Sequence, residues 1–285
     1  MNRRHVLAAA GAAWALSAEH GARAAAPQVA GPLDPGKPEH LHLIHRKLNF
    51  TYDDRLVFWF IRAVRYGLME GHFTPFWAMH VGMVFAIEDL GPHRYRSRGL
   101  IKIFYTDLAT GRLLETFDNP YTSQRRTVEQ PKLGRPVRVH GLTGVESDGP
   151  ALAGPDKGPV SRNAAIGPAW IIGDDVWCNG DLVVRAEPPN DLGQLIQVND
   201  WSTYHGSARA IADPDVPSAA ATHTFNDINT FNHPWIGMTG VPAWSVSRGF
   251  GRKGHDVDAM PAEWRRFMAD AHPEVMKDIK GAMAG

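Results

Sequence analysis

Short apolar or alternating runs, separated by turn residues, dominate this chain. Residues 56–63 and 76–87 are rich in β-branched and aromatic side chains, which favour strands. Residues 100–105 and 113–117 flank a loop that contains glycine, an arrangement typical of a hairpin. The pattern predicts a mainly β fold, in which an antiparallel meander is closed as a barrel or folded as a sandwich.

Turn residues subdivide the second half of the chain. Gly173-Asp174 and Asn179-Gly180 predict tight consecutive hairpins, because Gly and Asn tolerate the backbone angles that such turns need. Residues 144–168 are dense in Gly, Pro, Ser and Asp, which predicts a long loop, and loops of that length are often binding loops. Further strands are expected at 195–198, 202–210, 221–231 and 243–250.

One segment near the C-terminus has helical periodicity. Pro261 suits the first turn of a helix, and an apolar stripe follows at Trp264, Phe267, Met268 and Ala271. We therefore expect a short C-terminal helical segment from about residue 261, with a second helix behind the next proline.

The first 24 residues have the three parts of an export signal. Arg3 and Arg4 form a positive head, residues 6–18 an apolar middle, and residues 22–24 a small-residue cleavage site. Paired arginines are typical of the twin-arginine route, so we expect the twin-arginine export machinery as a partner and a periplasmic or secreted location. The apolar run is shorter than the ~20 residues of a spanning helix, so no stable membrane anchor is expected after cleavage.

Composition narrows the class of the mature protein. The 285-residue chain has 30 basic and 30 acidic residues, and removal of the signal's three arginines and one glutamate leaves a charge of about −2. Such a surface lacks the basic footprint that nucleic-acid binding needs. The single cysteine, Cys178, excludes an internal disulfide. We expect a flexible linker over 25–45, followed by one β-rich domain over 46–285.

Familiar ligand motifs are missing from the mature region. It contains no Cys-x-x-Cys, no zinc-protease motif and no dinucleotide loop, and the glycine-rich stretch 249–254 is interpreted as a turn. His40, His42 and His45 have no acidic or sulfur ligand beside them, so we interpret them as a solvated strip at the edge of the linker. The sequence leaves the identity of any cofactor unknown.

Several short blocks, in this order and spacing, resemble the landmarks of the domain-of-unknown-function family 1838. They are Tyr105 to Gly111, Leu114 to Thr122, Ile172 to Trp177, Asn199 to Tyr204 and the region of Trp235. The resemblance covers nearly the whole mature chain and extends to the export signal. It implies one exported domain, and it assigns no chemistry and no catalytic residue.

The densest chemistry lies at residues 199–205. Because alternate side chains of a strand face opposite ways, one face has Asp200, Ser202 and Tyr204, and the other has Asn199, Trp201, Thr203 and His205. We predict His205, Asp200 and Tyr204 as catalytic residues, with His205 as a general base and Trp201 as a ligand contact. The alternative is that Trp201 belongs to the core and that the polar groups bond to local backbone.

Two further sets of side chains are expected at the same cavity. Small-molecule pockets combine aromatic side chains with a few fixed polar groups. The predicted ligand-binding residues of this kind are Asn119, Tyr121, Asp175, Trp177, His233 and Trp235. Packing and turn formation are the alternative roles. We predict no metal site, and joint metal binding by His205, His223 and His233 is the alternative.

Three classes of function fit these features. The favoured one is an exported periplasmic enzyme that performs acid–base chemistry on a lipophilic or aromatic small molecule in a β-barrel pocket. The second is a binding or carrier barrel that takes the same ligand without changing it. The third is an envelope protein with a structural role and no pocket. Export in the folded state favours the enzyme, although the sequence does not decide whether the protein is one.

Overall fold

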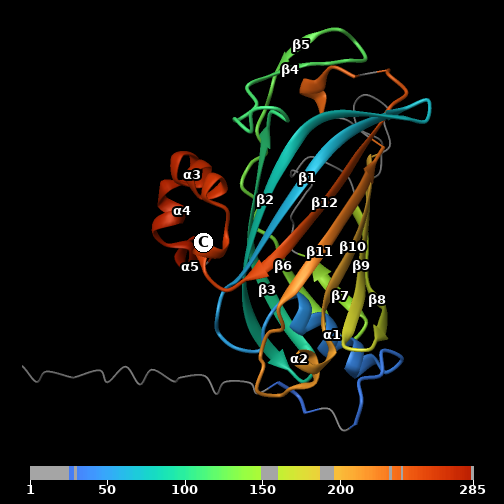
Figure 1. Ribbon diagram of the computed structural model, residues 1–285, viewed down its shortest axis with the longest axis vertical. Coiled ribbons are helices and arrows are strands. Elements are labelled where there is room, and N and C mark those ends of the chain that lie inside the picture. The colour runs from blue at the N-terminus through green and yellow to red at the C-terminus, as the bar shows by residue number, and fades with distance from the viewer. Residues whose placement is uncertain are drawn as a thin grey trace, which may run out of the picture.

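Ten strands form a closed antiparallel ring in the computed structural model of the protein (Figure 1). The structure describes residues 26–28, 31–148, 160–186, 196–230, 233–238 and 240–283, so the expected export signal at 1–24 lies outside the described residues. The elements, in chain order, are α1 (Pro38–Asn49), β1 (Val57–Met69), β2 (His72–Gly91), β3 (Arg94–Thr106), β4 (Thr116–Asp118), β5 (Arg125–Thr127), β6 (Val137–Gly141), β7 (Gly144–Asp148), β8 (Val160–Ile172), β9 (Asp175–Ala186), β10 (Ile196–Ser207), α2 (Ala208–Ala212), β11 (Ala221–Asn229), η1 (Pro234–Ile236), β12 (Trp244–Gly254), η2 (Val257–Ala259), α3 (Ala262–Ala271), α4 (Pro273–Lys277) and α5 (Ile279–Ala282).

The order of strands around the ring is β1-β12-β11-β10-β9-β8-β7-β6-β3-β2, and β2 pairs with β1 to close it. Strands β4 and β5 form a separate two-stranded sheet. The prediction of a mainly β antiparallel fold with short C-terminal helices is confirmed, and of the two predicted architectures the structure has the barrel.

Strands β1, β2 and β3 are covered on both faces. Their inward side chains meet the barrel interior, while their outward apolar side chains, such as Phe58, Val84 and Phe104, pack against Trp264 and Phe267 of α3. Figure 1 shows α3, α4 and α5 beside these strands, on the outside of the ring. This double burial explains why the sequence reads as nearly continuous apolar runs here rather than as strict alternation.

Helix α1 closes one end of the barrel, at the lower end of Figure 1. Its side chains Leu43, Ile44 and Leu48 are at most 1% exposed and pack into one cluster with strand residues such as Trp59. Burial of such side chains stabilises the fold by roughly 1.5–3 kcal/mol each. The expected flexible linker over 25–45 is therefore wrong from Pro38 onward, because this apolar helix face has a barrel end to fill.

The opposite end of the barrel carries the β4–β5 hairpin and η1 (Figure 1). Buried aromatic and aliphatic side chains of this end, among them Phe76, Trp77, Phe117 and Ile236, form a second cluster. We call this end of the barrel the cap.

Three predicted turns or loops belong to strands instead. Asn179-Gly180 lies inside β9, residues 249–254 lie inside β12, and the expected loop 144–168 contains β7 and the first part of β8. At Gly249 an added Cβ would approach the Arg62 carbonyl oxygen to 2.6 Å, so glycine permits close contact of β12 with β1. In these strands glycine provides space rather than a turn.

Candidate functional site

A cavity of about 300 Å³ lies inside the barrel, bordered by His45 and Asn49 of α1 at one end. Its volume is at the lower bound of the ~300–1,000 Å³ typical of small-molecule pockets. One wall comes from β1, β2 and β3 and is apolar except for Arg65, with the side chains of Trp59, Ile61, Met79, Val81, Met83, Phe85, Ile101 and Ile103. The wall formed by β10 and β11 is largely polar, so the cavity has two chemically different sides.

Strand β10 contributes Asp200, Ser202 and Tyr204 to the cavity wall. The Ser202 hydroxyl donates a hydrogen bond to Asp200 Oδ1 at 3.2 Å. The Tyr204 phenol lies on the same face of the strand, two residues beyond Ser202. The three polar side chains that the alternation predicted on one face thus lie in a row along this wall.

Asp227 lies directly opposite Asp200 on the neighbouring strand β11. Arg65 Nη1 donates to Asp227 Oδ1 at 3.2 Å and to the Ser245 hydroxyl at 2.9 Å, and the Ser247 backbone N–H donates to the same carboxylate at 2.8 Å. Arg65 and Asp227 are both buried. Asp227 therefore has a cation and an amide donor, as a buried carboxylate requires.

The environment of Asp200 favours its neutral form. Burial, and secondly the negative charge of Asp227, raise the pKa of the Asp200 carboxyl to about 7, although the Ser202 hydroxyl and the Arg138 charge favour ionisation. Burial also raises the pKa of the Tyr204 phenol, which stays neutral. A carboxyl group with this pKa can exchange a proton near neutral pH.

Three histidines of the cavity wall are neutral because they are buried. Burial lowers the pKa of His45 to about 3, lowers that of His223 to about 4, and brings that of His140 well below its ordinary value. The His223 ring stacks on Tyr204, with 4.6 Å between ring centroids. Within the described part of the chain, neither ring nitrogen of His223 has a hydrogen-bond partner.

The structure separates His205 from Asp200 and Tyr204. His205 points to the outer face of the barrel, where its Nε2 lies 2.8 Å from Asp175 Oδ1 and its ring stacks on Trp177. Trp201 is 48% exposed on the same strand. The prediction that His205, Trp201, Asp175 and Trp177 share a cavity with Asp200 is wrong, because none of the four lines it. On β10 they alternate with Asp200 and Tyr204, and on β9 with the buried Val176 and Cys178.

The predicted residues Asn119, Tyr121, His233 and Trp235 lie in the cap. Trp235 packs on Trp77 with 5.3 Å between ring centroids, and the His233 Nε2 lies 3.1 Å from the Tyr105 hydroxyl. Asn119 donates to the Ile236 carbonyl at 2.9 Å and accepts from the Tyr121 backbone N–H. These side chains pack and bridge the cap loops and do not line the cavity, so their expected convergence with Asp200 is also wrong.

Sequence reasoning missed Arg65 and Asp227, which both contribute to the cavity wall, and it named His223 of the same wall only as an alternative metal ligand. One signal was present for Arg65, since it occurs in an otherwise mostly apolar strand at an inward position. Asp227 had no such signal, because the facing of β11 depends on its pairing with β10.

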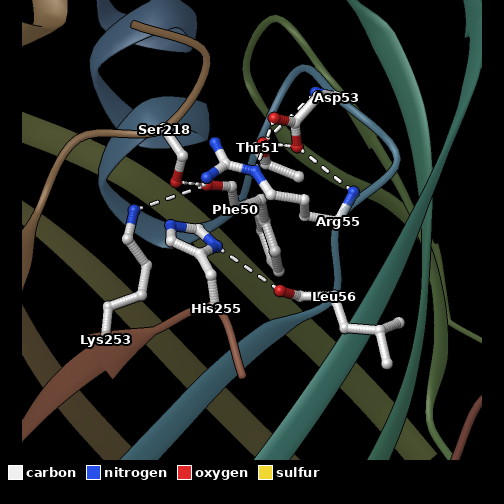
Figure 2. Close-up of polar contacts among 8 residues, drawn as sticks. All are labelled: Phe50, Thr51, Asp53, Arg55, Leu56, Ser218, Lys253 and His255. Carbon is white, nitrogen blue, oxygen red and sulfur yellow. Dashed lines mark hydrogen bonds and ion pairs between the residues drawn. The ribbon is translucent and has the colours of Figure 1, made fainter. Parts of the chain in front are cut away.

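Polar contacts fasten the end of α1 below the cavity (Figure 2). Lys253 Nζ donates to the Lys47 carbonyl at 2.5 Å and to the Phe50 carbonyl at 3.4 Å. The Ser218 hydroxyl donates to the same Phe50 carbonyl at 2.7 Å. Burial, and secondly the charge of Arg55, bring the pKa of Lys253 well below its ordinary value. Strand β12 and the segment before β11 thus hold the floor of the cavity in place.

No known family's profile matches this chain, and no curated protein matches it either. The resemblance to family 1838 therefore stays a prediction. None of the helices in the described ranges has the length and apolar character needed to cross a membrane. Of the described residues, no three His, Cys, Asp or Glu side chains are grouped to hold a metal ion. His205, His223 and His233 lie apart, on the outer face, in the cavity wall and in the cap.

Proposed function

We propose that the barrel cavity binds an amphipathic small molecule and that Asp200 transfers a proton to or from it. The observation that carries this proposal is the Asp200 carboxyl in the cavity wall, with a pKa of about 7. A general acid or base is most effective when its pKa is near the working pH. Ser202 and Tyr204 supply hydroxyl groups beside it, which can orient a polar group of the ligand.

The two walls of the cavity support an amphipathic ligand. The apolar body would lie against the eight apolar side chains of β1, β2 and β3, while the polar group would face β10 and β11. This orientation places the reacting group near Asp200. His205 has no part in the proposal, since it lies outside the barrel.

A carrier without catalysis is the second candidate. The apolar wall and the neutral histidines favour it, because they provide binding surface without requiring chemistry. A carrier would bind the ligand in the same orientation and release it unchanged.

Native mass spectrometry of the protein purified from its own envelope would identify the bound small molecule. The molecule is then incubated with the wild-type protein, Asp200→Asn and the outer-face control His205→Ala. We expect product from the wild type and the control, and binding without product from Asp200→Asn. Binding by all three with no product would favour the carrier, and product from Asp200→Asn would contradict a role of its carboxyl.

We also propose export through the twin-arginine route, supported by the residues of the first 24 positions. Replacement of both Arg3 and Arg4 by lysine should leave the protein in the cytoplasm. Cell fractionation would measure how much of the protein is exported. Unchanged export would instead favour the general secretory route.

A further inference from the structure

The charged side chains of the cavity do not balance once Asp200 is ionised. Among the residues that the structure describes, two arginines and three aspartates line it: Arg65, Arg138, Asp181, Asp200 and Asp227. The histidines of the wall are neutral because burial lowers their pKa values. When all three aspartates are ionised, the cavity therefore has one negative charge in excess. A buried uncompensated charge is unfavourable, so the cavity is complementary to one positive charge.

Two carboxyl groups of the cavity have no ion pair among the described residues, Asp181 and Asp200, and Asp200 is the more deeply buried of the two. Arg65 is engaged by Asp227 and Ser245, whereas the hydrogen bond that reaches the Asp200 carboxyl comes from the neutral Ser202 hydroxyl. A hydroxyl is a weaker partner for a carboxylate than a cation is. The ionised carboxyl can thus accept a further, charged donor from a ligand.

His223 is an independent sign that this cavity receives polar atoms. Its imidazole is 3% exposed and lines the cavity, and the described residues provide no partner for either ring nitrogen. A buried polar group without a partner is costly in a folded protein, so its presence indicates a missing hydrogen-bonding group. Packing alone would be served better by an apolar side chain at this position.

The opposite wall restricts the kind of cation. Eight apolar side chains of β1, β2 and β3 offer no ligand to a hydrated inorganic ion. They fit the hydrocarbon body of an organic molecule instead. A quaternary ammonium lacks the N–H donors that a carboxylate accepts, which leaves protonated primary, secondary and tertiary amines.

We infer that the ligand is an amine that carries one N–H-bearing positive charge and an apolar body, and that its ammonium group contacts Asp200. The inference rests on the proposed function and names the ligand class of the same cavity. The ammonium would lie between β10 and the cavity centre, and the apolar body would lie against β2. The presence of an amine determines which ligands bind tightly, and this applies equally to an enzyme and to a carrier.

Binding of such an amine would be coupled to the proton on Asp200. Below pH 7 the carboxyl must lose its proton before it pairs with the ammonium, so affinity should rise about tenfold per pH unit up to pH 7 and then level off. A neutral ligand of the same shape would not follow this profile.

Three naphthalene probes of matched shape test the inference: 2-(1-naphthyl)ethylamine, 2-(1-naphthyl)ethanol and 1-naphthaleneacetate. Isothermal titration calorimetry between pH 5 and 8 measures their affinities for the wild type, Asp200→Asn and the control Asp175→Asn, which removes one carboxylate from the outer face. We expect the amine to bind the wild type at least ~10-fold more tightly than the alcohol at pH 8, because a charged hydrogen bond exceeds a neutral one. The preference should disappear in Asp200→Asn and persist in Asp175→Asn.

Equal affinity of amine and alcohol for the wild type, or an unchanged preference in Asp200→Asn, would overturn the amine assignment. Absence of binding by all three probes to the folded protein would overturn it as well. These outcomes differ from failure of the proposed function, which appears as product formation by Asp200→Asn. If the protein is an enzyme that acts on neutral ligands, it should show no preference for the amine probe, and its product formation should still require Asp200.

Discussion

The carboxyl groups of Asp200 and Asp227 belong to directly opposed residues of β10 and β11, yet they have different partners. Asp227 accepts hydrogen bonds from Arg65 and from the Ser247 backbone, whereas Asp200 accepts one from the Ser202 hydroxyl. The ion-paired carboxylate therefore acts on its neighbour as a fixed negative charge, which helps to keep the Asp200 proton in place.

Asp200 should make the stability of the protein depend on pH. Its folded-state pKa of about 7 lies above the ordinary value of 3.8, so the folded state retains a proton that the unfolded state has lost. The stability contributed by the protonated carboxyl is complete below about pH 4 and is lost as the pH rises to 7, by up to ~4 kcal/mol. Urea unfolding between pH 4 and 8 should show this loss in the wild type and a flatter profile in Asp200→Asn. Parallel profiles for the two proteins would contradict the raised pKa.

Removal of the Arg65 cation should destabilise the barrel strongly. Arg65→Met leaves the buried Asp227 carboxylate without its ion-pair partner, which typically costs about 3–5 kcal/mol. Urea unfolding at pH 7 measures the loss. The control Arg125→Met removes an arginine whose side chain is 70% exposed, and it should change the stability by less than ~1 kcal/mol. Similar losses in both variants would show that burial of the pair is unimportant.

Lys253→Met should loosen α1 without unfolding the barrel. The substitution removes the hydrogen bonds from Lys253 to the carbonyl groups of Lys47 and Phe50 at the C-terminal end of the helix, worth about 1–3 kcal/mol. Hydrogen exchange followed by mass spectrometry should show faster exchange in residues 38–49 and little change in β1. Lys277→Met, in the exposed part of α4, is the matched control. Unchanged exchange in α1 would mean that apolar packing alone holds it.

His205→Ala should leave the cavity intact. His205 contacts Asp175 and Trp177 outside the barrel, so its loss should change neither probe binding nor the titration of the Asp200 carboxyl near pH 7. Carbon-13 NMR of the aspartate carboxyl groups would follow that titration. The signal that titrates near pH 7 should be absent from the spectrum of Asp200→Asn, which would assign it to Asp200. A shifted Asp200 pKa in His205→Ala would contradict the prediction and indicate coupling through the strand.

Local pattern was sufficient for much of the fold. The alternation along 199–205 predicted that Asp200, Ser202 and Tyr204 share a face, and the structure has all three in the cavity wall. The helix that begins at Ala262 was also readable, since the apolar stripe of Trp264 and Phe267 has helical spacing. Both features depend on contacts between residues close in sequence.

Long-range pairing decided the features that the sequence reading missed. The histidines at positions 40, 42 and 45 suggested a solvated polar strip. Residues 38–49 instead form α1, because its apolar side chains are buried at one end of the barrel. Asn179-Gly180 has strong turn chemistry, yet it pairs with Thr203 and Ser202 of β10 and remains in a strand. Tertiary contacts over many residues outweigh a local turn preference that is worth little on its own.

The sequence by itself determined that the chain is mainly β, that helices follow at its C-terminal end, and that Asp200 and His205 face opposite ways. Only the tertiary structure decided which of these two faces is the inside. A strand's side-chain period separates its two faces without saying which one meets the core, and that choice came from ring closure with β9 and β11. Ring closure also brought Arg65, from a distant part of the chain, to Asp227, and thereby left Asp200 with a neutral hydrogen-bond partner and a raised pKa.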